Sequence, residues 1–150
     1  MNIIFGAVVT LVSLLGWGGQ CIACLAPRLA VRLQLTEDEK HVDPAFYADA
    51  RGEAVWDALT LWILPVAGVL LMMKSVWWPY FGLAGGAMYV YFAGRGIAAR
   101  VSMQRRGIRI GKPGLSYLFL AIWGLLGAAT MIGGLFVAAD LIIGSLSAKD

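Results

Sequence analysis

The stretch GLSYLFLAIWGLLGAATMIGGLFVAA, residues 114–139, decides the class of fold because it contains no charged side chain. A helix of this length can cross the hydrocarbon core of a bilayer, which takes roughly 20 apolar residues at a 1.5 Å rise. Other uncharged, mostly apolar runs lie at residues 2–27, 58–73 and 75–94. We therefore predict an all-α membrane protein, an up-and-down bundle of four transmembrane helices near residues 2–26, 54–73, 79–98 and 115–145.

The composition favours the same class of protein. Hydrophobic residues make up 60% of the chain and charged residues only 14%, whereas a soluble domain has about a quarter charged residues. Too little polar sequence remains to cover a soluble core. The first apolar run lacks a basic start and is longer than the apolar region of a signal peptide, so we keep it as a helix. The chain is expected to be one integral membrane domain over residues 1–150, with loops at 27–53 and 99–114.

The positive charges predict the orientation. Of the 12 lysines and arginines, ten lie in or beside those two loops, and only Lys74 and Lys149 lie on the other side. Basic loops stay in the cytoplasm, so we expect a multi-pass protein of the cell inner (plasma) membrane with both termini outside. Four of the cations follow the third helix directly, and each would attract anionic lipid by about 1 kcal/mol. They are Arg105, Arg106, Arg109 and Lys112; the alternative is that they only fix the topology.

Besides Asp140 near the end of the last helix, two charged residues fall inside the apolar helices. Asp57 lies about one turn into the second helix, and Arg95 lies about one turn before the end of the antiparallel third helix. Burying an isolated charge in lipid costs roughly 2.5–3.5 kcal/mol, so we predict an Asp57–Arg95 ion pair, with Glu53 one turn further out. The pair could simply register two helices, or it could line a polar pocket open to the cytoplasm. The candidate binding residues are Arg51, Glu53, Asp57, Tyr91, Arg95 and Arg100.

No complete set of catalytic residues is visible in the sequence. The chain has no phosphate-binding loop and no Ser/His/Asp combination. Cys21 and Cys24 form a C-x2-C pair, but His41 is the single histidine, so no full ligand set for a metal can be assembled. We therefore assign no catalytic residue, no metal and no cofactor.

The layout resembles the MAPEG family, the membrane-associated proteins in eicosanoid and glutathione metabolism. The segment ARGEAVWDAL, residues 50–59, resembles the start of that family's second helix, and MYVYFAGRGIAAR, residues 88–100, resembles the Tyr- and Arg-rich end of its third helix. The resemblance implies glutathione bound at the cytoplasmic face between subunits of a trimer. The residues it assigns to that role are Arg51, Glu53, Asp57, Tyr89, Tyr91, Arg95 and Arg100.

Two functions remain open from the sequence. The first is a non-catalytic protein that acts as a homo-oligomer or as an accessory subunit packed against other spans and membrane lipids. Its basis is the small-residue spacing of Gly82 and Gly86 and of Gly124 and Ala128, which lets helices approach closely. The second is an enzyme or carrier of lipophilic or anionic small molecules. A cavity above about 300 Å³ at the charged residues would favour the second function. Nucleic acid is not an expected partner.

Overall fold

The computed structural model describes residues 2–147, and the regular secondary structure of this part of the chain is entirely helical, without a strand. Its elements are α1 (Asn2–Leu25), α2 (Pro27–Arg32), the short 3₁₀ helix η1 (Glu39–His41), α3 (Pro44–Thr60), α4 (Ile63–Met72), α5 (Trp78–Arg105) and α6 (Pro113–Ser147).

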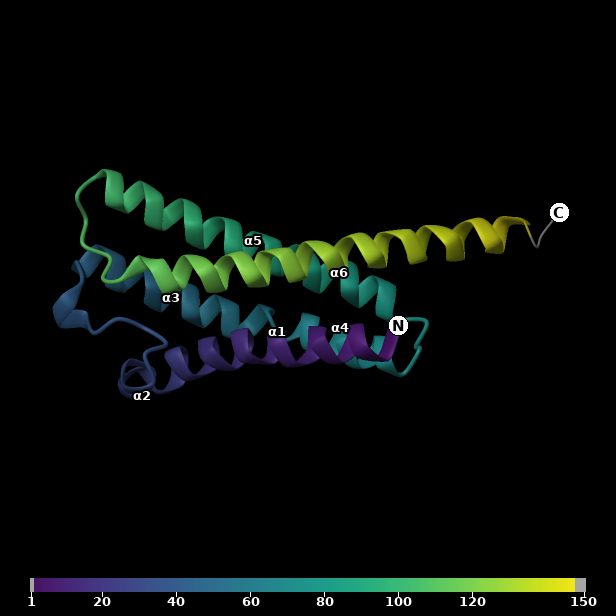
Figure 1. The fold of residues 1–150 in the computed structure, drawn as a ribbon, viewed down its shortest axis with the longest axis horizontal. Helices are drawn as coiled ribbons and strands as arrows, with labels where there is room; N and C mark the ends of the chain where they lie inside the picture. The colour runs from purple at the N-terminus through teal and green to yellow at the C-terminus, as the bar shows by residue number, and fades with distance from the viewer. Residues whose placement is uncertain (1, 148–150) are drawn as a thin grey trace.

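The long helices lie side by side along one axis (Figure 1). Helices α3 and α4 follow each other nearly in line, so the chain passes along this axis four times. Helix α6 packs along α5, α1 packs against α3 and α4, and α4 packs against α5. The start of α1 and the end of α6 point toward one end, whereas α2, η1 and the α5–α6 loop lie at the other (Figure 1). We call this second end the loop end.

Three helical stretches in the described part are long and apolar enough to cross a membrane. They are Ile3–Leu25, Pro44–Met72 and Gly114–Ile143. Helix α5 is not one of them, because its glycines and tyrosines lower its hydropathy although it has 28 residues. The all-α class is confirmed. Four apolar spans were predicted, and three helical stretches of the described residues are long and apolar enough to be spans.

Two predicted loops are shorter in the structure. Helix α3 already begins at Pro44, because the carboxylate of Asp43 accepts a hydrogen bond from the backbone N–H of Ala45 at 2.9 Å. Proline suits the first helical position, where its missing N–H is not needed. Helix α5 continues to Arg105. The predicted loops 27–53 and 99–114 therefore contain α2 at 27–32, η1 at 39–41, and helix at 44–53, 99–105 and 113–114.

The small residues allow close packing within the chain. A Cβ atom on Gly86 of α5 would lie 2.5 Å from the carbonyl oxygen of Gly127 in α6. One on Gly6 of α1 would lie 2.8 Å from the carbonyl oxygen of Gly68 in α4. Such distances leave no room for a side chain. The sequence leaves open whether the glycine spacing serves packing within the bundle or between copies. In the structure these glycines are used between helices of one copy.

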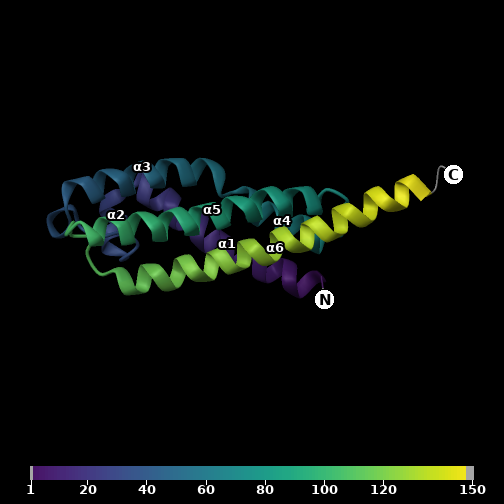
Figure 2. The same cartoon turned by 90° about the horizontal axis from the view of Figure 1, so that it is seen from above.

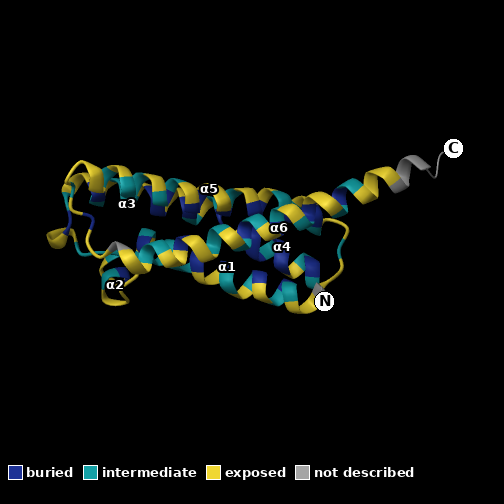
Figure 3. Cartoon of the chain, turned by 45° about the horizontal axis from the view of Figure 1, so that its top comes forward, coloured by how far each residue is buried: buried dark blue, intermediate teal, exposed yellow. Residues whose placement is uncertain are grey.

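Aromatic side chains hold α1 to the other helices. The Tyr89 hydroxyl donates to the carbonyl oxygen of Ser13 at 2.7 Å, and the Trp17 indole donates to that of Ala58 at 2.8 Å. The Trp123 indole donates to the carbonyl oxygen of Val12 at 3.1 Å. Tyr89 is fully buried in the core. Exposed residues lie along the outer faces of the helices (Figure 3), and on α6 they include large apolar side chains such as Leu125 and Phe136.

The two basic loops meet at the loop end, as the predicted topology requires. The backbone N–H of Asp43 donates to the carbonyl oxygen of Arg109 at 2.8 Å, and that of Lys112 donates to the Glu37 carboxylate at 2.8 Å. At the opposite end, α6 runs on beyond the other helices (Figure 2). Lys149, one of the two cations assigned to that side, lies outside the described residues.

Candidate functional site

The candidate site lies beside an interruption between α3 and α4, the two helices of the second pass. Helix α3 ends at Thr60 and α4 begins at Ile63, with Leu61 and Trp62 in a turn between them. Pro65 explains this break, because it has no N–H for the carbonyl group of Leu61 and its ring crowds that group. The sequence predicts a kink at Pro65, and the structure places the interruption one turn earlier.

The break lets α3 and α4 lie differently against α5. At the start of α4 the two backbones nearly touch, since a Cβ atom on Gly85 would lie 2.8 Å from the Cα atom of Leu64. Helix α3, by contrast, makes few contacts with α5. The result is a groove between α3 and α5 on the loop-end side of the break.

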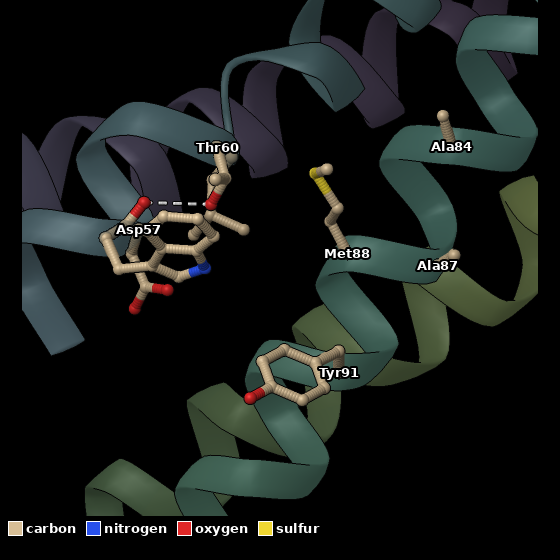
Figure 4. A pocket seen from close by; sticks show the side chains of 8 residues that line it. Asp57, Thr60, Ala84, Ala87, Met88 and Tyr91 are labelled. Atoms are coloured by element: carbon tan, nitrogen blue, oxygen red, sulfur yellow. Dashed lines mark hydrogen bonds between the residues drawn. The ribbon is translucent and has the colours of Figure 1, made fainter.

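Two adjoining pockets make up this groove. The first has a volume of about 350 Å³ and is lined mainly by apolar side chains. Its α3 wall includes Trp56, Asp57 and Thr60, and its α5 wall includes Met88 and Tyr91. Figure 4 shows Asp57 and Thr60 facing Met88 and Tyr91 across the gap. The second pocket, of about 290 Å³, continues toward the loop end and shares Trp56, Asp57 and Tyr91 with the first; it is also lined by Glu53 and Arg95.

Asp57 lines both pockets, and it forms no ion pair with any residue that the structure describes. The residue is only 5% exposed, and its Oδ2 atom is buried without a hydrogen-bond partner. The predicted Asp57–Arg95 ion pair is not formed. Arg95 instead contacts Asp49 at 2.6 Å and Glu53 at 2.8 Å. Its side chain reaches toward the loop end, where it stays 33% exposed, as long basic side chains do at an interface.

Glu53 is shared by two arginines of α5. Its Oε1 atom lies 2.8 Å from Nη1 of Arg95, and its Oε2 atom lies 3.8 Å from Nη1 of Arg100. The contact between Glu53 Oε1 and Arg95 Nη1 is an ion pair and not a directed hydrogen bond, because neither atom has a hydrogen-bond partner. Arg100 also donates to the carbonyl oxygen of Gly96 at 3.0 Å and lies over the ring of Phe46. Glu53 is therefore neutralised within the chain.

The other predicted site residues divide between the groove and the surface. Tyr91 lies at the mouth of the groove with 62% exposure. Arg51 lies elsewhere, because its guanidinium donates to the carbonyl oxygens of Ala23 and Cys24 at the end of α1, a position where a cation favours the helix dipole. The cations predicted to contact anionic lipid are all exposed at the loop end, namely Arg105, Arg106, Arg109 and Lys112.

Several residues at the site, Asp49 and Trp56 among them, were not in the predicted set. Asp49 precedes Glu53 by four residues, so the two share a helix face. Extending the predicted helix back to Pro44 would have found Asp49. Trp56 lines both pockets, but no spacing pattern in the sequence indicates it as a site residue. The thiols of Cys21 and Cys24 are free, and the described residues contain no cluster of three potential metal ligands.

The groove thus combines an apolar wall, two aromatic rings at its mouth and one buried carboxylate, Asp57, that forms no ion pair with a described residue. Such a concave site can hold a small molecule by its apolar part and orient it by one polar contact. Comparison of the chain with protein-family models, with curated proteins and with solved structures finds no match.

Proposed function

We propose that this chain is a membrane protein that binds lipophilic small molecules in the groove between α3 and α5. The observation that carries the proposal is the buried Oδ2 atom of Asp57, which has no partner and lies on the wall of a pocket of about 350 Å³. Leaving a charge in a membrane helix unpaired is costly, and such residues mark functional sites by default. The volume lies within the range of about 300–1,000 Å³ that is usual for small-molecule sites.

The proposed setting is the inner (plasma) membrane. Helices α1, α3–α4 and α6 supply three spans, and we propose α5 as the fourth because it packs along both α4 and α6. The meeting of both basic loops at one end supports a cytoplasmic loop end with both termini outside. The groove then opens sideways at the depth of the inner leaflet, since Trp56 and Tyr91 at its mouth are 61% and 62% exposed. The exposed cations of the α5–α6 loop would face anionic head groups.

This proposal favours the second of the two functions that the sequence left open. The small-residue faces that suggested a homo-oligomer or accessory subunit are occupied within the chain, so self-association rests on no remaining observation and stays a prediction for native mass measurement. Glutathione, implied by the family resemblance, stays a prediction too. Its carboxylates would compete with Glu53 for Arg95 and Arg100, and thermal stabilisation by glutathione would support that resemblance.

A pocket-filling variant tests the proposed function. Ala87 lines the first pocket, so Ala87→Trp should fill it. Ala98 is also exposed on α5 but lines neither pocket, so Ala98→Trp is the matched control. We expect n-octanol to bind the wild-type chain in nanodiscs of zwitterionic lipid, measured by titration calorimetry against empty nanodiscs. Binding should be lost in Ala87→Trp and kept in Ala98→Trp. Equal binding to both variants would refute the groove as the site.

A further inference from the structure

The charges around the groove do not balance. Helix α3 places three carboxylates on one face, and α5 places two guanidinium groups opposite them. Arg95 contacts both Asp49 and Glu53, and Arg100 contacts Glu53. The three carboxylates outnumber the two guanidinium groups by one, and Asp57 is the carboxylate that forms no ion pair with a described residue. Asp57 is also more deeply buried than Glu53.

Three of the donors near Asp57 are already used by backbone carbonyl groups. The Thr60 hydroxyl donates to the carbonyl oxygen of Trp56 at 2.9 Å, the interaction drawn in Figure 4. The Trp17 indole donates to Ala58, the next residue after Asp57. The Tyr89 hydroxyl donates to Ser13. None of these three groups is free for the Oδ2 atom of Asp57, and no described residue donates a hydrogen bond to it. A ligand bound in the groove can supply that donor.

We propose that the ligand of this groove carries a positively charged head group that donates hydrogen bonds, a primary ammonium, and that this group binds the Asp57 carboxylate. The inference rests on the proposed function and adds the class of ligand. Trp56 and Tyr91 stand at the groove mouth, where aromatic faces attract a cation. Past them, Ala87 and Met88 line the apolar part of the first pocket, where the hydrocarbon portion of the ligand lies.

An anionic head group fits the same groove poorly. It would meet the unpaired charge of Asp57 at close range. Arg95 and Arg100 could receive it only by giving up contacts with Glu53, whose side chain is 7% exposed. Leaving such a buried carboxylate without its partners is strongly unfavourable. A neutral head group could donate one hydrogen bond to Asp57 but would leave its charge uncompensated.

Three probes with the same chain and different head groups test the inference. n-Octylammonium, n-octanol and n-octanoate are titrated at pH 7 into the wild-type protein in nanodiscs of zwitterionic lipid, with empty nanodiscs subtracted. We expect n-octylammonium to bind at least tenfold more tightly than n-octanol, and n-octanoate more weakly than either. This order needs no variant, so it does not depend on any substituted chain folding.

Asp57→Asn then assigns the preference to its residue. The amide keeps the shape of the side chain and removes the charge, so the ratio of affinities for n-octylammonium and n-octanol should fall to within about twofold of one. Equal affinities on the wild-type chain, tightest binding of n-octanoate, or a preference that survives in Asp57→Asn would each overturn the inference. The proposed function would still stand after any of these outcomes if n-octanol binding is lost in Ala87→Trp and kept in Ala98→Trp. If no probe distinguishes Ala87→Trp from Ala98→Trp, both proposals fail.

Discussion

Two carboxylates on α3, one helical turn apart, should respond to neutralisation in opposite directions. Glu53 and Asp57 are similarly buried, at 9% and 5% exposure. Glu53 has two arginine partners, whereas the Oδ2 atom of Asp57 has none. Glu53→Gln should therefore lower the free energy of unfolding, and Asp57→Asn should raise it. Each substitution replaces a carboxylate by the amide of the same shape, so each is the control for the other.

The magnitudes follow from the contacts. A hydrogen bond or ion contact to a charged group contributes about 1.5–3 kcal/mol, and the 33% exposure of Arg95 places Glu53 at the lower end, so Glu53→Gln should cost about 1.5 kcal/mol. A carboxylate in a membrane helix costs roughly 2.5–3.5 kcal/mol. Part of this remains in Asp57→Asn, because an amide without a partner still costs about 1–3 kcal/mol. The expected gain for Asp57→Asn is about 1 kcal/mol.

Thermal unfolding in a mild detergent, followed by circular dichroism without added ligand, measures both changes. For a chain of this size, 1 kcal/mol corresponds to about 2–4 °C in Tm. We expect a decrease of roughly 3–6 °C for Glu53→Gln and an increase of roughly 2–4 °C for Asp57→Asn. A decrease of similar size in both variants would refute the distinction between a paired and an unpaired carboxylate, and with it the argument for the groove.

Further substitutions test the packing that shapes the groove. Gly86→Ala should destabilise the chain by about 1–3 kcal/mol because its Cβ atom would overlap α6, whereas Gly94→Ala, with nothing within 4 Å, should stabilise α5 by about 0.5–1 kcal/mol; thermal unfolding compares the two, and equal effects would contradict the α5–α6 contact. Tyr89→Phe should cost about 0.5–1.5 kcal/mol, because it removes the hydrogen bond from the Tyr89 hydroxyl to the carbonyl oxygen of Ser13, and an unchanged Tm would mean that this hydrogen bond is absent. Asp43→Ala should cost about 1 kcal/mol through loss of the cap of α3, and faster amide exchange confined to the first turn of α3 would locate the effect.

The helices and their caps could largely be read from the sequence. Uncharged runs act locally, so they predicted α1 and α6 without reference to any partner helix. The Asp43–Pro44 pair is an equally local signal for the start of α3, although the second helix was predicted to begin only near residue 54. The ion pairing could not be read in the same way. A long arginine side chain reaches carboxylates several residues apart, and only the placement of α3 beside α5 decides that Arg95 contacts Asp49 and Glu53 rather than Asp57.

For this protein, the amino-acid sequence by itself determined the helical class, the apolar character of three stretches and the clustering of positive charge in two loops, because each depends on residue type and spacing along one helix. Only the tertiary structure decided that the glycines are used within the chain, that the second pass breaks before Pro65, and that Asp57 is left unpaired in an open groove. Those features depend on distances between helices, which are set by how backbones pack and not by any single segment.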